Sequence, residues 1–217
     1  MTTVLDHLAI GTPALADGWE LFGGVLGGTW AYGMDSPGYW WGQLEFAAGP
    51  KIELLTPAGG NDAAFLERFL AARGAGPHHF NFLVTDIEDA LTRIRAHGIV
   101  IQVAQQGATR SPPPPRELPE PGPPARFDLI EHHVGDLDGA VRLFTDVLDG
   151  RPEAAGPGTA ELTWPGGKRI RLVREEGLRG GAVRRVRFTR ARGAFGAQDR
   201  ERAALLAKRL GLTLELG

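Results

Sequence analysis

The feature that most constrains the fold of this chain is an internal repeat. The pattern LF..VL.G occurs at residues 21–28 and again at residues 143–150. In each half an alternating strand pattern comes before this motif, and glycine ends the helix that the motif closes. A repeated sequence unit forms the same supersecondary structure each time it occurs. The sequence therefore predicts two copies of one arrangement of strands and helices.

Hydrophobic periodicity predicts the same order of elements in both halves. The first half is expected to contain a strand, a helix, two strands, and then a strand, a helix and a strand, at residues 3–11, 14–28, 40–47, 50–57, 79–85, 86–98 and 99–104. The second half repeats this order at residues 127–135, 137–150, 159–165, 168–175, 184–190, 199–211 and 212–217.

A proline-rich segment separates the two halves. It reads SPPPPRELPEPGPPAR and covers residues 111–126. Proline fixes φ and removes a backbone donor, so this segment is expected to be an extended linker outside any sheet interior. The predicted domains are residues 1–110 and residues 127–217, each near 100 residues and large enough for a compact unit.

Composition excludes several classes of function. A formal net charge of -2 argues against a general binder of nucleic acid or membrane surfaces. The chain has no cysteine, which excludes disulfides, thiolate metal ligands and a cysteine nucleophile. The N-terminus lacks a signal-peptide pattern, and no apolar run reaches the roughly 18 residues that a membrane span needs. The expected location is the cytoplasm.

Three polar residues of the first half lie in strand patterns beside the apolar residues Leu8, Ile52, Leu54 and Phe80. The three polar residues are His7, Glu53 and His79. Because side chains alternate along a strand, each points away from its apolar neighbours. Imidazole and carboxylate ligands together suit Zn, Fe, Mn, Co or Ni and leave coordination positions open. The spacing alone is not specific, and strand histidines of the ordinary surface or core kind remain the alternative.

Two segments resemble a known family. LDHLAIG with a helix ending in VLGG resembles the opening of vicinal-oxygen-chelate proteins, the glyoxalase, bleomycin-resistance and extradiol dioxygenase superfamily. KIELLTP followed by HHFNFLVTDIEDALTRIRAHG is most similar to methylmalonyl-CoA epimerase within it. The resemblance implies an α+β fold in which paired βαβββ modules form curved mixed sheets. It further implies two tandem glyoxalase-like domains, each with a contracted second module.

The resemblance also implies a metal site. In that family the equivalents of His7, Glu53 and His79 bind one divalent metal ion, whereas His78 would face away. The family's fourth ligand is a glutamate in the closing strand, and Gln102 occupies the matching position if residues 99–104 form that strand. Glutamine coordinates through its carbonyl oxygen without charge. The expected ion is Zn, Co, Mn, Fe or Ni.

The second half has lost these residues. His7 corresponds to Leu129, Glu53 to Arg171 and His79 to Arg185, so this domain is predicted to be degenerate. The arginines at 171, 185 and 187 either line an anion pocket or face solvent. Alternation places His132 opposite to Glu131 and His133, which disfavours a second metal centre there.

These residues predict a metal-dependent enzyme for a small substrate with two neighbouring oxygens, such as an acyl-CoA or another anionic compound. The reaction would pass through an enolate-type intermediate, as an epimerase, isomerase or lyase, with ring-opening dioxygenase chemistry also open. Gln43 and Glu45 are the candidates for proton transfer. The alternative is a non-catalytic small-molecule binder of the drug-sequestering type. A homodimer is expected.

The aromatic residues around the second strand of the first half have two interpretations. They pack the wall of the domain, or they line a ligand pocket; they are Trp30, Tyr32, Tyr39, Trp40 and Trp41.

Overall fold

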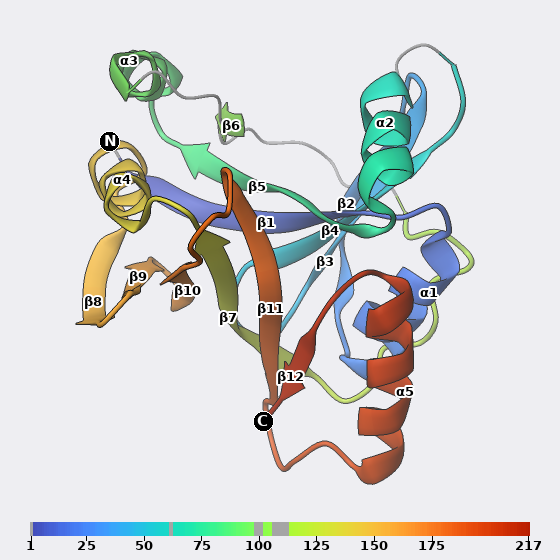
Figure 1. Cartoon of the computed structure of the whole chain (residues 1–217). Coiled ribbons are helices and arrows are strands. Elements are labelled where there is room, and N and C mark those ends of the chain that lie inside the picture. Colours follow the sequence, from blue (N-terminus) through green and yellow to red (C-terminus); the bar gives the residue numbers. More distant parts are fainter. Residues whose placement is uncertain (1, 61–62, 98–101, 106–112) are drawn as a thin grey trace.

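The computed structural model describes residues 2–60, 63–97, 102–105 and 113–217. Two six-stranded mixed sheets form the framework of the molecule (Figure 1). The sheet of the first half has the strand order β2-β3-β4-β1-β5-β6, and the sheet of the second half has the order β12-β11-β7-β10-β9-β8. Each sheet is thus built entirely from one half of the chain.

The elements of the first half follow the predicted order with two additions, the strand β2 and the helix α2. They are β1 (Thr3–Gly11), α1 (Leu15–Trp19), the π-helical turn η1 (Glu20–Val25), β2 (Thr29–Ser36), β3 (Tyr39–Glu45), β4 (Lys51–Pro57), α2 (Ala64–Arg73), β5 (Gly76–Val84), α3 (Ile87–His97) and β6 (Gln102–Gln105).

The second half repeats this succession without an equivalent of α2. Its elements are β7 (Ala125–Val134), α4 (Leu137–Arg142), the π-helical turn η3 (Leu143–Val147), β8 (Arg151–Gly156), β9 (Thr159–Trp164), β10 (Lys168–Arg174), β11 (Gly181–Arg190), α5 (Ala197–Arg209) and β12 (Leu214–Leu216). Among the described helices, none has the length and apolar character needed to cross a membrane.

Both halves have the topology of a complete βαβββ module joined to a contracted one. In the first half β1 pairs in parallel with β4 and antiparallel with β5, and β7 makes the same two pairings with β10 and β11. After β5 or β11 the chain forms one helix and a single parallel strand, β6 or β12. This confirms the predicted fold of two tandem domains with contracted second modules.

The edge strands β2 and β8 were not predicted as strands. Their sequences, TWAYGMDS and RPEAAG, contain glycine, proline or short polar residues that obscure the alternation. An edge strand pairs on one side only and tolerates such residues better than a central strand does. The two strands complete the βαβββ modules that the remaining elements imply.

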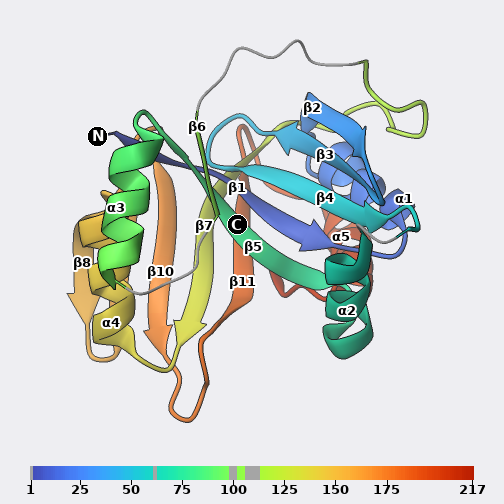
Figure 2. The same ribbon diagram turned by 90° about the horizontal axis from the view of Figure 1, so that it is seen from above.

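The helices connect the two halves. Helix α5 of the second half packs against η1 and α1 of the first, and α3 of the first half packs against η3 of the second. Figures 1 and 2 show these two helix pairs at opposite ends of the molecule. One hydrophobic core contains buried residues from both sheets, including Leu8 and Ile52 of the first and Ile130 and Phe188 of the second. The halves therefore share a core.

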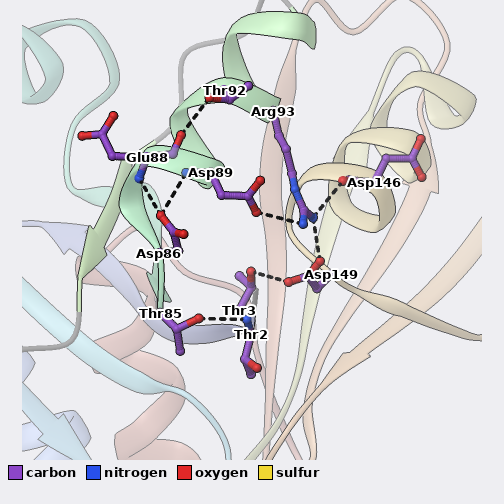
Figure 3. A network of polar contacts seen from close by, with 10 residues as sticks. All are labelled: Thr2, Thr3, Thr85, Asp86, Glu88, Asp89, Thr92, Arg93, Asp146 and Asp149. Atoms are coloured by element: carbon purple, nitrogen blue, oxygen red, sulfur yellow. Dashed lines mark hydrogen bonds and ion pairs between the residues drawn. The ribbon is translucent and has the colours of Figure 1, made fainter.

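Polar contacts fix the junction between α3 and the turn after η3 (Figure 3). Arg93 of α3 donates a hydrogen bond of 2.9 Å to the carboxylate of Asp149 and forms an ion pair of 3.0 Å with Asp89. The other carboxylate oxygen of Asp149 accepts a hydrogen bond of 2.8 Å from Thr3 of β1. Asp149 has a positive φ of 53°, so its backbone conformation is one that few residues adopt.

The described part of the proline-rich segment packs on the first half. Gly122 donates a backbone hydrogen bond of 3.1 Å to Gly23, and Leu118 lies against the shared core. Arg190 of β11 donates to the backbone carbonyls of Val25 and Pro123, which joins all three parts of the chain. Strand β7 already begins at Ala125, so the last two residues of the predicted linker lie in a sheet; residues 111–112 are outside the described ranges.

Candidate metal centre

Three adjacent strands bring the predicted metal ligands together. In the pairing of β1 with its neighbours, Ala9 lies opposite both Glu53 of β4 and His79 of β5. His7 is two residues from Ala9 and so extends from the same face of β1. One ligand atom from each of His7, Glu53 and His79 lies within 4.8 Å of the others. The neighbouring apolar residues of these strands point into the shared core on the opposite face.

His7 is held by a carboxylate that the sequence alone did not suggest. Its Nδ1 lies 2.8 Å from the carboxylate of Asp6. The same carboxylate forms an ion pair of 2.8 Å with Lys51. Nε2 of His7 is buried without a hydrogen-bond partner and lies 3.5 Å from Glu53. Burial lowers the pKa of His7, but Asp6 and Glu53 outweigh this effect and leave the pKa above its usual value.

Glu53 is a buried carboxylate with fixed orientation. Its side chain is 8% exposed, and the amide nitrogen of Gln43 donates a hydrogen bond of 2.8 Å to its Oε2. Burial raises the pKa of Glu53, yet the nearby imidazole of His7 and the hydrogen bond from Gln43 lower it further than burial raises it. Glu53 is therefore ionised at neutral pH and supplies the negative charge of the group.

His79 is the neutral imidazole of the group. Burial lowers its pKa to about 4, against the attraction of Glu53. Its Nδ1 lies 2.7 Å from Nδ1 of His78, while its Nε2 is buried without a hydrogen-bond partner. His78 turns away from the group and packs against Phe65 and Phe69. The Nε2 atoms of His7 and His79 and the carboxylate of Glu53 thus remain available to a shared cation.

The donor set fits a divalent metal ion. Two imidazoles and one carboxylate are the ligands that Zn, Fe, Mn, Co and Ni accept, and three protein ligands leave positions open for a substrate. Two buried nitrogens without hydrogen-bond partners are unfavourable unless something binds them. The hydrogen bond between Asp6 and His7 has the form in which a carboxylate orients a metal-binding imidazole.

Asn81 is a polar residue of the site that sequence reasoning did not identify. It lies opposite His7 in the pairing of β1 with β5, is 5% exposed, and its Oδ1 has no hydrogen-bond partner. Its position two residues after His79 places both on one face of β5, which alternation would have revealed. Asp6 carried no such signal, because strict alternation places it on the face opposite to His7. A shift in register between Leu5 and His7 brings the two side chains together.

The remaining predicted site residues differ in their placement. Gln43 is buried and contacts Glu53, whereas Glu45 is exposed at the end of β3. The backbone of Gln102 lies in β6 beside Asn81, and its side chain is outside the described residues. Strand β6 follows α3 and pairs in parallel with β5. Its place in the chain is therefore that of the strand directly after the helix.

Strand register confirms which residues of the second half correspond to the metal ligands. Glu131 of β7 lies opposite both Arg171 and Arg185, as Ala9 lies opposite Glu53 and His79. The arginines are engaged by carboxylates rather than free. Arg171 forms an ion pair of 2.9 Å with Glu161. Glu215 pairs with Arg187 at 2.9 Å and with Arg185 at 3.6 Å.

The histidines of β7 form no second group of metal ligands. Both ring nitrogens of His133 contact carboxylates, at 3.1 Å to Glu131 and 2.9 Å to Glu175. His132 points to the opposite face and packs against Phe80. Within residues 2–60, 63–97, 102–105 and 113–217, the group of His7, Glu53 and His79 is the only one with three suitable ligand atoms in reach of one another.

The aromatic residues of β2 and β3 serve packing on both faces of the sheet. Trp30 and Trp40 contact Trp19 of α1, with ring centroids 6.2 and 5.4 Å apart. Tyr39 and Trp41 lie on the other face, beside the small cluster under α2. This arrangement favours the interpretation of these residues as wall packing.

Solved structures with low sequence identity share the fold of this chain. A xylose isomerase-like TIM barrel/4-hydroxyphenylpyruvate dioxygenase fusion protein superposes with a TM-score of 0.61 at 16% identity, over 95% of this chain and 40% of that one. A mutant of 4-hydroxymandelate synthase from Streptomyces coelicolor gives 0.62 at 12% identity, over 97% and 74%. A hypothetical protein from Staphylococcus aureus gives 0.59 at 12% identity, over 89% and 93%. This chain therefore spans less than half of the fusion protein.

Sequence comparison finds one family model that is similar to the first half of the chain. Among curated proteins no relative matches the sequence. The model of the glyoxalase/bleomycin resistance protein/dioxygenase superfamily matches residues 6–111, a range that contains His7, Glu53 and His79. Residues 6–111 are therefore similar to the glyoxalase/bleomycin resistance protein/dioxygenase superfamily, and the chain as a whole has an α+β fold of two tandem domains.

Proposed function

We propose that this protein is a metal-dependent enzyme whose metal centre consists of His7, Glu53 and His79. The observation that carries the proposal is the convergence of three donor atoms within 4.8 Å on one buried sheet face. Two of the three residues, His7 and His79, keep an unpartnered buried nitrogen. A structural role would favour hydrogen-bonded imidazoles, because unsatisfied buried polar groups cost free energy.

The residues around the centre have separate tasks. Asp6 fixes the ring of His7 through Nδ1, which leaves Nε2 directed at the shared position. Gln43 holds one carboxylate oxygen of Glu53 and thereby sets its orientation. The unpartnered Oδ1 of Asn81 supplies a further neutral oxygen donor on the same face. A divalent cation bound there would act as a Lewis acid that polarises two neighbouring substrate oxygens.

The substrate class we propose is a small carbon acid with two adjacent oxygens, such as an acyl-CoA thioester or a 2-oxo acid. The resemblance of residues 51–98 to methylmalonyl-CoA epimerase supports an isomerase or lyase reaction through an enolate-type intermediate. Gln43 and Glu45 are the candidates for proton transfer. Gln43 contacts Glu53, and Glu45 follows it by two residues on the same face of β3.

Metal analysis tests the centre directly. The purified protein, loaded in turn with Zn, Co, Mn, Fe or Ni and freed of excess ion, is expected to contain about one ion per chain. The substitutions His7→Ala and Glu53→Ala are expected to abolish that stoichiometry, whereas His133→Ala in the second half leaves it unchanged. Full metal content in the Glu53→Ala protein would remove the basis of the proposal.

Isotope exchange tests the chemistry. Incubation of the metal-loaded protein in deuterium oxide with acyl-CoA thioesters and 2-oxo acids is expected to introduce deuterium at the acidic carbon of one class. The same incubation with the Glu53→Ala protein serves as the control. A protein that binds metal but exchanges no substrate of either class would redirect the search toward oxygen-dependent reactions.

A non-catalytic small-molecule binder is the second candidate. The observation that favours it is the second half, where Leu129, Arg171 and Arg185 replace the three ligands. This candidate predicts that the protein takes up no metal from any of the loading mixtures and still binds an organic ligand. Metal stoichiometry therefore separates the two candidates before any substrate is known.

A further inference from the structure

A second site lies between the two halves of the molecule. A cavity of about 1000 Å³ opens where β5 and the end of α2 face β7, α4 and β11. Its volume is at the upper end of the range for small-molecule pockets. Leu8 and Phe80 form part of the wall, and both belong to the sheet face opposite to His7 and Glu53. Of the three proposed metal ligands, only His79 borders this cavity.

The walls of the cavity are mainly apolar and aromatic. Phe80 and Phe144 come from different halves, and the ring of His132 packs against both, at centroid distances of 5.1 and 6.4 Å. Phe69 and Leu143 extend the apolar surface at either end. Such a surface favours a ligand with a flat or branched apolar body, because burial of that body releases water from both surfaces.

The rim carries two guanidinium groups without partners. Arg73 ends α2 on the first half and Arg142 ends α4 on the second, and both line the cavity. Neither forms an ion pair or a side-chain hydrogen bond within the described part of the chain, although most arginines of the second sheet are paired with carboxylates. The acidic residue in the lining, Asp136, caps α4 by accepting a hydrogen bond of 2.9 Å from Gly139.

We propose that this cavity between the halves binds an organic anion, with its apolar body against Phe80, His132 and Phe144 and its acidic group at Arg73 or Arg142. A carboxylate, sulfonate or phosphate pairs with a guanidinium through charge-assisted hydrogen bonds. His79 borders both sites, but the groups that the proposal uses, Phe80, His132, Phe144 and the two arginines, do not belong to the proposed metal ligands.

Two fluorescent probes that differ only in charge test the proposal. 8-Anilinonaphthalene-1-sulfonate carries a sulfonate, and N-phenyl-1-naphthylamine is the same ring system without it. Both are expected to bind the full-length protein with a stoichiometry of one. In the double variant Arg73→Gln/Arg142→Gln, the affinity for the sulfonate is expected to fall about tenfold, while the affinity for the neutral probe changes less than about twofold.

The matched control removes the same number of positive charges at positions outside the cavity. The double variant Arg68→Gln/Arg95→Gln removes one exposed arginine from α2 and one from α3, neither of which lines the cavity. It is expected to bind both probes as the unmodified protein does. Equal weakening of the sulfonate in both double variants would show a general charge effect and overturn the proposal.

Filling the cavity provides a second line of evidence. Ala140→Trp on α4 and Ala182→Trp on β11 place a large ring in the cavity from two different elements. Each variant that keeps the melting temperature of the parent is expected to lose both probes. Retention of both probes in such a variant would place the probes elsewhere and overturn the proposal. The Glu53→Ala protein is expected to bind both probes normally, so the outcome is separate from that of the metal tests.

Discussion

At the scale of single residues, the arrangement around His7 depends on a departure from regular strand geometry. Asp6 and His7 are consecutive, and a regular strand would direct them to opposite faces. The shift in register between Leu5 and His7 allows the carboxylate of Asp6 to reach Nδ1 of its neighbour. Lys51 compensates the buried charge of Asp6 from β4. The irregularity therefore creates an orienting contact for the proposed ligand.

Replacement of Asp6 tests this contact. Asp6→Asn keeps the volume of the side chain but removes the charge that fixes the tautomer of His7. Loss of such an outer carboxylate is expected to weaken metal binding about 10- to 100-fold. The measurement is competition for Co or Zn with a chelator of known affinity. Asp35→Asn, an exposed substitution on β2, is the control, and equal affinities in the two variants would contradict the role given to Asp6.

His132 makes the stability of the protein depend on pH. Burial, with a smaller effect from the charge of His133, lowers the pKa of His132 to about 4. The unfolded chain has an ordinary histidine pKa near 6.5 and so binds the proton first as the pH falls. Stability contributed by the neutral ring is therefore complete above pH 6.5 and is lost progressively between pH 6.5 and 4.

The size of this effect is measurable with one variant. Between pH 7.5 and 5.5 the unmodified protein is expected to lose about 1 kcal/mol more unfolding free energy than the His132→Phe protein, which cannot take up that proton. Urea denaturation at the two pH values gives both losses. Identical losses in the two proteins would show that His132 keeps an ordinary pKa in the folded state.

The sequence alone revealed the polar residues that lie in otherwise apolar strand patterns. His7, Glu53 and His79 lie in strands with apolar residues, and three strands place them on one face. It did not find Asp6, because the contact arises from an irregular pairing. It did not find Asn81, because an amide in a strand carries no chemical signature until its burial is known.

At the scale of elements, the helices decide how the halves combine. Each of α1 and α4 continues into a π-helical turn, at residues 20–25 and 143–147, so the repeat extends to local backbone detail. Helix α5 then packs on η1 of the other half. Its hydrophobic face contains Ala203 and Leu206, whereas Leu205 is 54% exposed.

A pair of neighbouring substitutions tests the packing of α5. Leu206→Ala removes a side chain that is 6% exposed and is expected to cost about 2–4 kcal/mol of unfolding free energy. Leu205→Ala removes the same atoms from a largely exposed position and is expected to cost less than about 0.5 kcal/mol. Chemical denaturation of both variants measures the difference. Similar costs would mean that α5 does not pack as the structure shows.

The order of the central strands was predictable because their burial requires a periodic or continuous pattern of apolar residues. Strands β1, β4, β5, β7, β10 and β11 all have alternating or continuous apolar patterns, and they form the middle of each sheet. The edge strands β2 and β8 escaped prediction because an edge needs little apolar sequence. The packing of α5 on the first half was also beyond prediction, since a helical pattern shows which face is buried but not which element covers it.

At the scale of the whole molecule, the two sheets share one topology but carry different side chains at corresponding positions. The first sheet presents His7, Glu53 and His79 with an Ala9 between them, and the second presents Glu131 between arginines at the corresponding positions. In the second sheet, Arg171 and Arg187 form ion pairs with the carboxylates of Glu161 and Glu215. The shared core keeps both sheets in one folding unit.

This shared core predicts that the halves unfold together. In a Trp164→Phe background all remaining tryptophans lie in the first half, so their fluorescence reports on that half alone, while far-ultraviolet circular dichroism reports on both. Leu172→Ala, in the centre of the second sheet, removes a fully buried side chain and is expected to cost about 3 kcal/mol. For a chain of this length that loss lowers the melting temperature by about 6–12 °C. Because both halves bury residues in one core, the fluorescence and dichroism midpoints are expected to fall equally, and a fluorescence midpoint that stays in place would show two independent domains.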